Sequence, residues 1–440
     1  MFETFRNAWK VQDLRRKLLF TLFIIIVFRI GGAIPVPFLN SAAIQSWFES
    51  SASGTFFGYM NMLSGDNFSR GTLLALSIGP YINAQIIIQL LTYALPPLER
   101  LSKEGPEGRK KLNKITKVAS LAIAAFQSWA YYLTLRNAGA VRYAQGATAF
   151  DRIFAQIVII FCFTAGASLI IWLGDQINER GIGNGISMIL FAGIIAKVPS
   201  DIIGLIGGAI DKGDIGAYIL VAFVGVLFLA MIGFIIFMNH AERRIPVQYA
   251  KRVVGNKMYG GQSSYIPIKI AMSGVLPIIF ASAFVSLPST LRMFIEPNPA
   301  STNFFMKAYI KLLEWFSYTH PVYAIIYLLL IVGFNYFYVS MQYNPIEIAN
   351  NLRQNNGGVP GIRPGKPTSD FISKILSKLT LFGAFFLGII AIIPIFLAKF
   401  TGLNLALGGT SILIVVSVAL ETVRALESQM MMRHHKGFLE

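Results

Sequence analysis

A continuous apolar run is joined to a long basic segment in residues 216–252, which read GAYILVAFVGVLFLAMIGFIIFM and then NHAERRIPVQYAKR. An α-helix needs about 20 apolar residues to cross roughly 30 Å of hydrocarbon. The basic segment continues to about residue 266, giving a loop at 239–266, and a second such loop covers residues 344–370. A carrier of small solutes mostly needs short links between its helices. Long cationic loops therefore indicate a membrane protein that docks something large.

The composition places the whole chain in a lipid bilayer. Hydrophobic residues make up 55% of the 440 residues, charged residues only 13%, and the mean hydropathy is +0.59. Soluble domains contain about 25% charged residues. We therefore expect an all-α polytopic membrane protein. A β-barrel would instead show period-2 alternation in segments of about ten residues. The single Cys162 excludes an internal disulfide.

Ten apolar runs have the length of a membrane-spanning helix. If alternate loops lie on opposite sides, the side that holds both termini carries most of the 38 lysines and arginines. The positive-inside rule then places both termini in the cytoplasm. The runs cover residues 18–36, 72–96, 115–135, 153–174, 185–206, 216–238, 268–291, 321–342, 375–398 and 405–427.

A polar link at residues 207–215 divides the ten helices into five and five. An odd number of spans in each half gives the two halves opposite orientations, which permits an inverted repeat with a site between them. We therefore predict two pseudo-symmetric inverted halves, residues 1–210 and 211–440. This prediction rests on topology, since the sequence shows no clear residue-level repeat.

The segment between the first two runs is too short to cross the membrane. Residues 54–71 hold an apolar core of about ten residues, interrupted by Gly58 and Gly65. Half-helical backbone at membrane depth survives only where protein or water shelters it. Two interpretations stay open: an external loop at the interface, or a loosely tethered re-entrant helix that occupies a cavity.

Motifs for enzymes and cofactors are weak. Residues 181–185, Gly-Ile-Gly-Asn-Gly, do not have the spacing of a dinucleotide fingerprint. Residues 361–366 lack the length and the Ser or Thr of a phosphate loop. The four histidines have no metal-ligand spacing. We expect neither an enzyme nor a cofactor. A secondary solute:cation symporter is the alternative, although the predicted spans hold no paired carboxylates.

Several segments along the chain carry a resemblance. They read IGPYI at 78–82, KEGPEGRK at 103–110, GIGNGIS at 181–187, RRIPVQYAKR at 243–252, PGIRPG at 360–365 and GGTS at 408–411. In this order they resemble the hallmark segments of the SecY family of bacterial protein-conducting channels. The resemblance implies a multi-pass protein of the bacterial cytoplasmic membrane. Its expected function is to translocate unfolded polypeptides and to release transmembrane segments laterally into lipid.

The resemblance further implies a central pore between the halves, closed by a ring of six apolar side chains. Water leaves a narrow hydrophobic constriction, so ions meet a barrier there. Aliphatic side chains can still part around a polypeptide. The matching positions are Ile78, Ile82, Ile186, Leu190, Ile279 and Ile414.

A plug and a lateral gate are also implied by the resemblance. Asn83, Gln85 and Gln127 would lie at the gate, where hydrogen bonds between helices contribute about 0.6–2 kcal/mol each. Ordinary bonding between neighbouring helices is the alternative for these amides. The plug, at about residues 57–68, would include Phe57, Tyr59, Met60, Asn61, Met62, Leu63, Asp66 and Phe68.

The basic loops are expected to bind partners. The resemblance implies SecE and SecG subunits, the SecA motor ATPase and the ribosome, with signal peptides, unfolded preproteins and membrane lipid as further contacts. Arg363 stands between Pro360-Gly361 and Pro364-Gly365, so a rigid turn would present its guanidinium to SecA. The docking residues would be Arg243, Arg244, Lys251, Arg252, Lys257 and Arg363.

Overall fold

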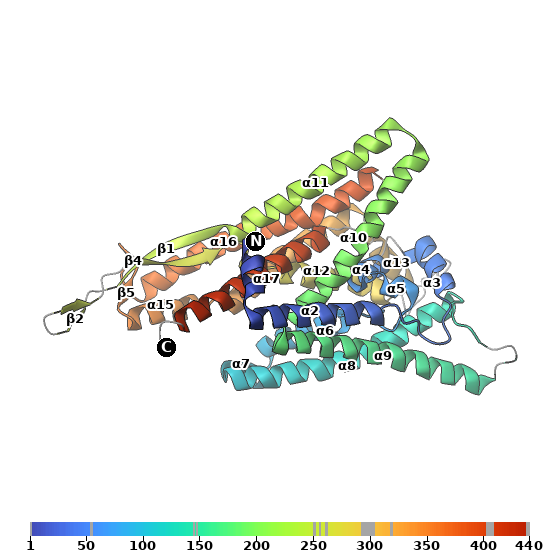
Figure 1. Ribbon diagram of the computed structural model, residues 1–440, viewed down its shortest axis with the longest axis horizontal. Helices are drawn as coiled ribbons and strands as arrows, with labels where there is room; N and C mark the ends of the chain where they lie inside the picture. Colours follow the sequence, from blue (N-terminus) through green and yellow to red (C-terminus); the bar gives the residue numbers. More distant parts are fainter. Residues whose placement is uncertain are drawn as a thin grey trace.

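The protein is mostly helical in the part of the chain that the structure describes. This computed structural model covers residues 2–52, 56–143, 146, 148–249, 252–254, 257–259, 263–291, 304–316, 320–401 and 409–436. Figure 1 shows an elongated bundle, with the hairpin of β1 and β4 at one end and the short helices α3, α4 and α5 toward the other. The fold class predicted from composition is thus confirmed.

Ten helices overlap the ten predicted apolar runs. In the first half they are α2 (Gln12–Gly31), α6 (Gly79–Ala94), α8 (Pro106–Asn137), α9 (Ala149–Arg180) and α10 (Gly185–Lys212). In the second half they are α11 (Ile215–His240), α12 (Leu276–Leu291), α14 (Pro321–Gln342), α16 (Lys366–Thr401) and α17 (Gly409–Lys436). Within the described residues, α8, α9, α10, α11, α14 and α16 are long and apolar enough to cross a membrane.

Shorter helices complete this helical part. They are α1 (Phe2–Lys10), α3 (Ser41–Trp47) with the π-helical turn Phe48–Ala52, α4 (Phe56–Ser64), α5 (Asn67–Arg70), α7 (Pro96–Lys103), α13 (Phe304–Trp315) and α15 (Pro345–Gln354). The terminal helices α1 and α17 pack together through a small cluster that includes Ala8 and Leu426. The Thr4 hydroxyl donates to Glu427 across this contact.

Several helix boundaries differ from the apolar runs, and three of the differences are informative. Residues 72–78 form turns, and α6 begins only at Gly79, with Pro80 in its first turn. Likewise α12 begins at Leu276, because the preceding residues belong to a strand and to a turn at Gly274 with φ +61°. The polar link at 207–215 is helical up to Lys212, and the chain turns only at Gly213, where φ is +60°. Apolarity alone does not distinguish a buried turn from a helix.

The described parts of the two basic loops form strands that join the loops to each other, which the sequence did not predict. Strand β1 (Glu242–Tyr249) pairs antiparallel with β4 (Ser263–Lys269), with Ile245 opposite Ile266. Strand β1 also pairs with β5 (Gly357–Gly358) from the second loop, so the strand order is β4-β1-β5. A separate ribbon joins β2 (Arg252–Val254) and β3 (Lys257–Tyr259).

Apolar clusters lie within each half and between the halves. The cluster of the first half includes Phe68, Tyr131 and Phe163. The cluster of the second half includes Ile235, Ile331 and Ile390. A third cluster beneath the sheet, around Val247 and Ile372, fixes the joined loops to α14, α15 and α16. The remaining large cluster draws on both halves.

Candidate functional site

The six positions predicted for the pore ring meet at the apolar cluster between the halves. Helices α2, α6, α9 and α10 contribute to it from the first half, and α12 and α17 from the second. One position, Ile186, is partly buried and packs against this cluster. The other five are buried members of it: Ile78, Ile82, Leu190, Ile279 and Ile414.

The segment at 181–187 positions Ile186 and Leu190. Asn184 caps α10 by accepting hydrogen bonds from the backbone of Ile186 at 3.1 Å and Ser187 at 3.4 Å. A Cβ on Gly185 would lie 1.9 Å from the carbonyl oxygen of Gly174, so only glycine allows α10 to start this close to α9. The glycine-rich sequence thus serves helix packing, which brings the first turns of α10 to the cluster.

The plug segment is packed inside the protein. Met62 and Leu63, in α4, belong to the same buried cluster as the ring positions. Ser411, at the start of α17, contacts the sulfur of Met62. Ser77, just before α6, donates to the carbonyl oxygen of Leu63 at 3.2 Å. Protein therefore shelters α4 on several sides, as the re-entrant interpretation requires.

The expectation of a loosely tethered plug is wrong for its two ends. Phe57, Met60 and Phe68 are buried in the cluster of the first half. Phe68 stacks on Tyr131 at 4.3 Å between ring centroids, and the Tyr131 hydroxyl donates to the carbonyl oxygen of Phe68. Large aromatic rings gain free energy when they leave water, so they anchor the segment. The side chain of Tyr59 lies outside the described residues.

Several polar residues of the plug segment form hydrogen bonds with one another and with α5. The Asn61 amide donates to Asp66 at 2.8 Å and accepts from the backbone of Ser69 at 2.8 Å. The Ser64 hydroxyl accepts from the backbone of Phe68 at 3.0 Å. Short helices leave backbone N–H groups without an intrahelical acceptor. Asn61 and Ser64 supply acceptors for α5, which explains polar residues in a buried segment.

The three polar side chains predicted for the lateral gate lie on α6 and α8 of the first half. Asn83, Gln85 and Gln127 are half-buried, and among the described residues none of them forms a hydrogen bond with the second half. The Gln127 side-chain oxygen is buried without any such partner in this part of the chain. The contact between the halves here is apolar, since Tyr93 of α6 meets Phe337 of α14 at 5.5 Å between ring centroids.

The residues predicted to dock partners belong to the two joined loops. Arg243 and Arg244 are exposed on β1, and Arg244 lies 4.7 Å over the ring of Tyr265. A hydrogen bond with Glu242 at 2.7 Å raises the pKa of Arg244, so this side chain stays cationic. Lys251 lies outside the described residues. Arg252 and Lys257 lie on β2 and β3, and their side chains are outside the description as well.

Arg363 is exposed on the turn between β5 and α16. Gly361 and Gly365 on either side have φ of +81° and +100°, conformations that favour glycine. The Thr368 hydroxyl donates to the carbonyl oxygen of Arg363 at 2.9 Å and ties the turn to the start of α16. The predicted rigid turn is therefore present, and its guanidinium faces away from the core.

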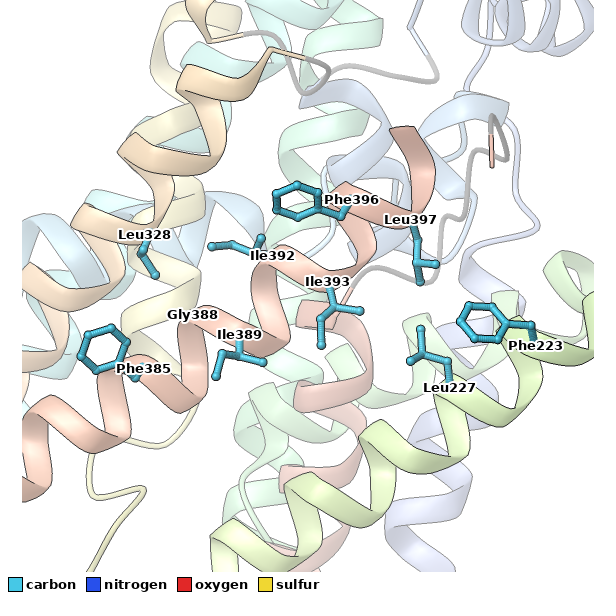
Figure 2. Close-up of a pocket in the computed structure, with 10 residues that line it drawn as sticks. All are labelled: Phe223, Leu227, Leu328, Phe385, Gly388, Ile389, Ile392, Ile393, Phe396 and Leu397. Atoms are coloured by element: carbon cyan, nitrogen blue, oxygen red, sulfur yellow. The ribbon is translucent and has the colours of Figure 1, made fainter. Parts of the chain in front are cut away.

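An apolar groove on the outside of the bundle is separate from the ring cluster. It has a volume of about 490 Å³ and lies between α11, α14 and α16. Figure 2 shows Phe223 and Leu227 on one side of it and Phe385, Ile389 and Phe396 along α16. All its lining residues are apolar or glycine, as suits a surface of spanning helices that faces hydrocarbon.

Two charged residues inside α10 were not predicted from the sequence to be functional. Lys197 and Asp201 lie within the apolar run 185–206, and Lys197 forms an ion pair with Asp66 of the plug segment. A charge within a spanning run is rare and costly, so it is by itself a signal of function. The average apolarity of the run obscured this signal.

Sequence comparison matches the chain to one family model and to relatives that share one name. The family model for SecY matches residues 72–423. Protein translocase subunit SecY of Streptomyces galbus is 40% identical over 451 residues, covering 100% of both chains. Protein translocase subunit SecY of Thermus thermophilus is 40% identical over 440 residues, covering 100% of this chain and 98% of its own.

Solved structures show the same fold. A protein-conducting channel superposes with a TM-score of 0.59 at 19% identity, covering 94% of this chain and 92% of that chain. Sec61 in the canine ribosome–channel complex from the endoplasmic reticulum superposes with a TM-score of 0.58 at 18% identity, with the same coverage. In a third neighbour, with a TM-score of 0.61 at 19% identity and the same coverage, the plug domain stabilises the closed state and maintains a membrane seal. These comparisons do not favour a solute:cation symporter.

Proposed function

The chain belongs to the SecY family, and from this premise we propose that the path of its translocated polypeptide runs through the apolar cluster between residues 1–210 and 211–440. The protein is a multi-pass membrane protein and a protein translocation channel, and its family is one of channels rather than known enzymes. The proposal concerns which residues form the channel. The observation that carries it is the meeting of all six ring positions in one cluster.

The ring is the seal of the resting channel. Its six side chains come from α12 and α17 in the second half and from α6 and α10, with Ile78 just before α6, in the first. Aliphatic side chains offer ions no ligand and water no hydrogen bond, so a closed ring stays dry. They also hold the halves together only by packing, which a passing chain can replace with its own contacts.

The plug is the second barrier, and the buried contacts of Met62 and Leu63 support this role. These side chains fill the cluster from within α4 rather than from a spanning helix. Their withdrawal would remove packing from the ring without disturbing the long helices around it. The aromatic anchors Phe57 and Phe68 would keep the ends of the segment in place while its middle moves.

Lateral release of apolar segments would take place between the pair α6 and α8 and the pair α12 and α14. The contact of Tyr93 with Phe337 supports this assignment, because an apolar seam costs little to open when an apolar client helix replaces it. The polar side chains in this region then belong to the first half alone and do not hydrogen-bond to the described residues of the second half. They are Asn83, Gln85 and Gln127.

The joined basic loops are proposed as a single docking platform. SecA and the ribosome would bind there, on the cytoplasmic side of a bacterial inner membrane, with both termini on that side. SecE and SecG would complete the complex. Arg243 and Arg244 are exposed on β1, and Arg363 is exposed on the turn that follows β5 of the same sheet. This supports the proposal, because guanidinium groups bind phosphates and acidic surfaces. The canine ribosome–channel complex with the same fold supports the ribosome as a partner.

Reconstitution into liposomes tests the whole proposal. Liposomes that hold the purified complex should translocate an unfolded preprotein when SecA and ATP are added. The same liposomes should not concentrate amino acids or sugars along a sodium or proton gradient. Ring variants should alter ion leakage, and platform variants should alter export without leakage. Solute uptake in place of preprotein export would overturn the assignment.

A further inference from the structure

An ion pair ties the plug segment to α10. The Asp66 carboxylate lies 2.5 Å from the Lys197 ammonium, and their side chains are only 23% and 13% exposed. Lys197 lies well inside α10, so its charge needs a partner at this depth. Removing one partner of a buried pair leaves an uncompensated charge, which is strongly unfavourable. The pair is therefore a contact that resists departure of the plug.

The backbone of the plug segment directs Asp66 toward α10. Gly65 and Asp66 both have left-handed φ, +66° and +70°, and form the turn between α4 and α5. A Cβ on Gly65 would lie 2.7 Å from the carbonyl oxygen of Gly193, so this turn rests directly on α10. The guanidinium of Arg29 also reaches the carbonyl oxygen of Gly65, at 3.5 Å.

A second carboxylate stands one helical turn from Lys197. Asp201 is four residues further along α10, and residues at i and i+4 share one face of a helix. Within the described residues, the Oδ2 atom of Asp201 is buried and has no hydrogen-bond partner. Asp201 is thus near Lys197, which already forms an ion pair with Asp66 of the plug segment.

We propose that Lys197 is a two-position latch, held by Asp66 when the plug is seated and by Asp201 when the middle of the plug segment has moved away together with Asp66. Without Asp201, departure of Asp66 would leave a sheltered lysine unpaired. With Asp201, Lys197 keeps a carboxylate partner in both states, so the plug is held firmly but released at lower cost. Lys197 and Asp201 are positioning residues, and the inference rests on the proposed function of residues 57–68 as a plug.

The latch predicts opposite effects for its two carboxylates. Asp66→Asn keeps the side-chain shape and tolerates the left-handed backbone, and Lys197→Met keeps the apolar stem. Each should raise the resting conductance of the purified complex in planar bilayers roughly tenfold. This size lies between the free-energy losses expected for breaking an exposed and a buried ion pair. The double variant should conduct no more than either single variant, because both remove the same interaction. Lys197→Arg should retain most of the seal.

Asp201→Asn should act in the other direction. Resting conductance should fall below that of the native channel, and the rate of opening by a signal peptide should drop about fivefold, because Lys197 loses its second partner. Combined with Lys197→Met, the Asp201 change should have no further effect. Asp211→Asn, the same substitution at an exposed site of α10, is the matched control.

Three outcomes would overturn the latch. Additive effects of Asp66→Asn and Lys197→Met would show that the two residues act separately. A rise in conductance for Asp201→Asn would make Asp201 part of the closed state only. If deletion within residues 57–67 opens the channel while Asp66→Asn and Lys197→Met do not, the plug stands and the latch fails. If the deletion leaves the channel closed, the plug assignment itself fails.

Discussion

Gln248 of β1 pairs with Gly358 of β5, and this pairing joins two basic loops that lie far apart in the sequence. Tyr249 continues the ladder opposite Gly357, and a Cβ on Gly357 would lie 2.9 Å from the Tyr249 ring. Only a residue without a side chain fits against that ring. The strand that carries Arg243 and Arg244 is consequently joined to the loop that carries Arg363, so a partner bound to one loop also acts on the other.

Polar substitution in the ring should make the resting channel leak. Ile279→Asn places an amide in a dry cluster, where it binds water and lowers the barrier to ions. We expect a higher resting conductance in planar bilayers and weaker rejection of defective signal sequences, and the same for Ile82→Asn. Ile159→Asn is the matched control, since Ile159 is buried in the cluster of the first half. An unchanged conductance in both ring variants would remove these residues from the constriction.

Gly185 should tolerate no side chain. In Gly185→Ala the new Cβ meets the carbonyl oxygen of Gly174, and overpacking of this kind costs about 1–3 kcal/mol. We expect a lower midpoint of thermal unfolding in detergent and a disturbed ring, because α10 carries Ile186 and Leu190. Gly208→Ala, on the same helix, has open space around it and should stabilise by roughly 0.5–1 kcal/mol. Equal effects of the two changes would refute the close-packing argument.

Deletion within residues 57–67 should open the channel at rest while the bundle still assembles. Loss of Met62 and Leu63 uncovers the ring, whereas the spanning helices keep their own contacts. Loss of Phe57 also removes packing from the first half, so the unfolding midpoint should drop as well. Deletion of residues 61–65 alone spares both aromatic anchors and should leak with less loss of stability. A bundle that fails to assemble in both cases would make the segment purely structural.

The spanning helices could be predicted from the sequence because hydrocarbon sets a minimum length of apolar residues. The ring could not be singled out in this way. Ile78 and Ile82 form an i,i+4 pair like many packing pairs, and only resemblance to a family distinguished them. The pairing of β1 with β5 depends on contact between distant segments, which leaves no local pattern. Lys197 does leave a local signal in the sequence. The signal is missed because a single charge hardly changes the mean apolarity of a long run.

Arg363 provides the sharpest test of the docking platform, because its backbone holds the turn while its side chain is proposed to bind the partner. Its side chain is exposed, and the turn is held by the backbone of Arg363 through Thr368 rather than by the guanidinium. Replacement should therefore leave membrane insertion and helix packing intact. A guanidinium makes planar bidentate contacts with carboxylates, whereas a carboxylate in its place repels them and an ammonium offers only a point charge.

Arg363→Glu should abolish SecA-driven export in inverted vesicles while the complex still purifies normally, and Arg363→Lys should restore part of it. Ribosome-coupled insertion should suffer less, because Arg243 and Arg244 share that wider surface and each exposed contact contributes little alone. Arg353→Glu reverses an exposed charge at the end of α15, in the same loop, and should export normally. Normal export by the Arg363→Glu channel at limiting SecA would place the motor elsewhere. An equal loss of export in the Arg353→Glu variant would show that the net charge of the loop matters rather than a contact made by Arg363. A bidentate contact depends on one position, whereas attraction by the net charge does not.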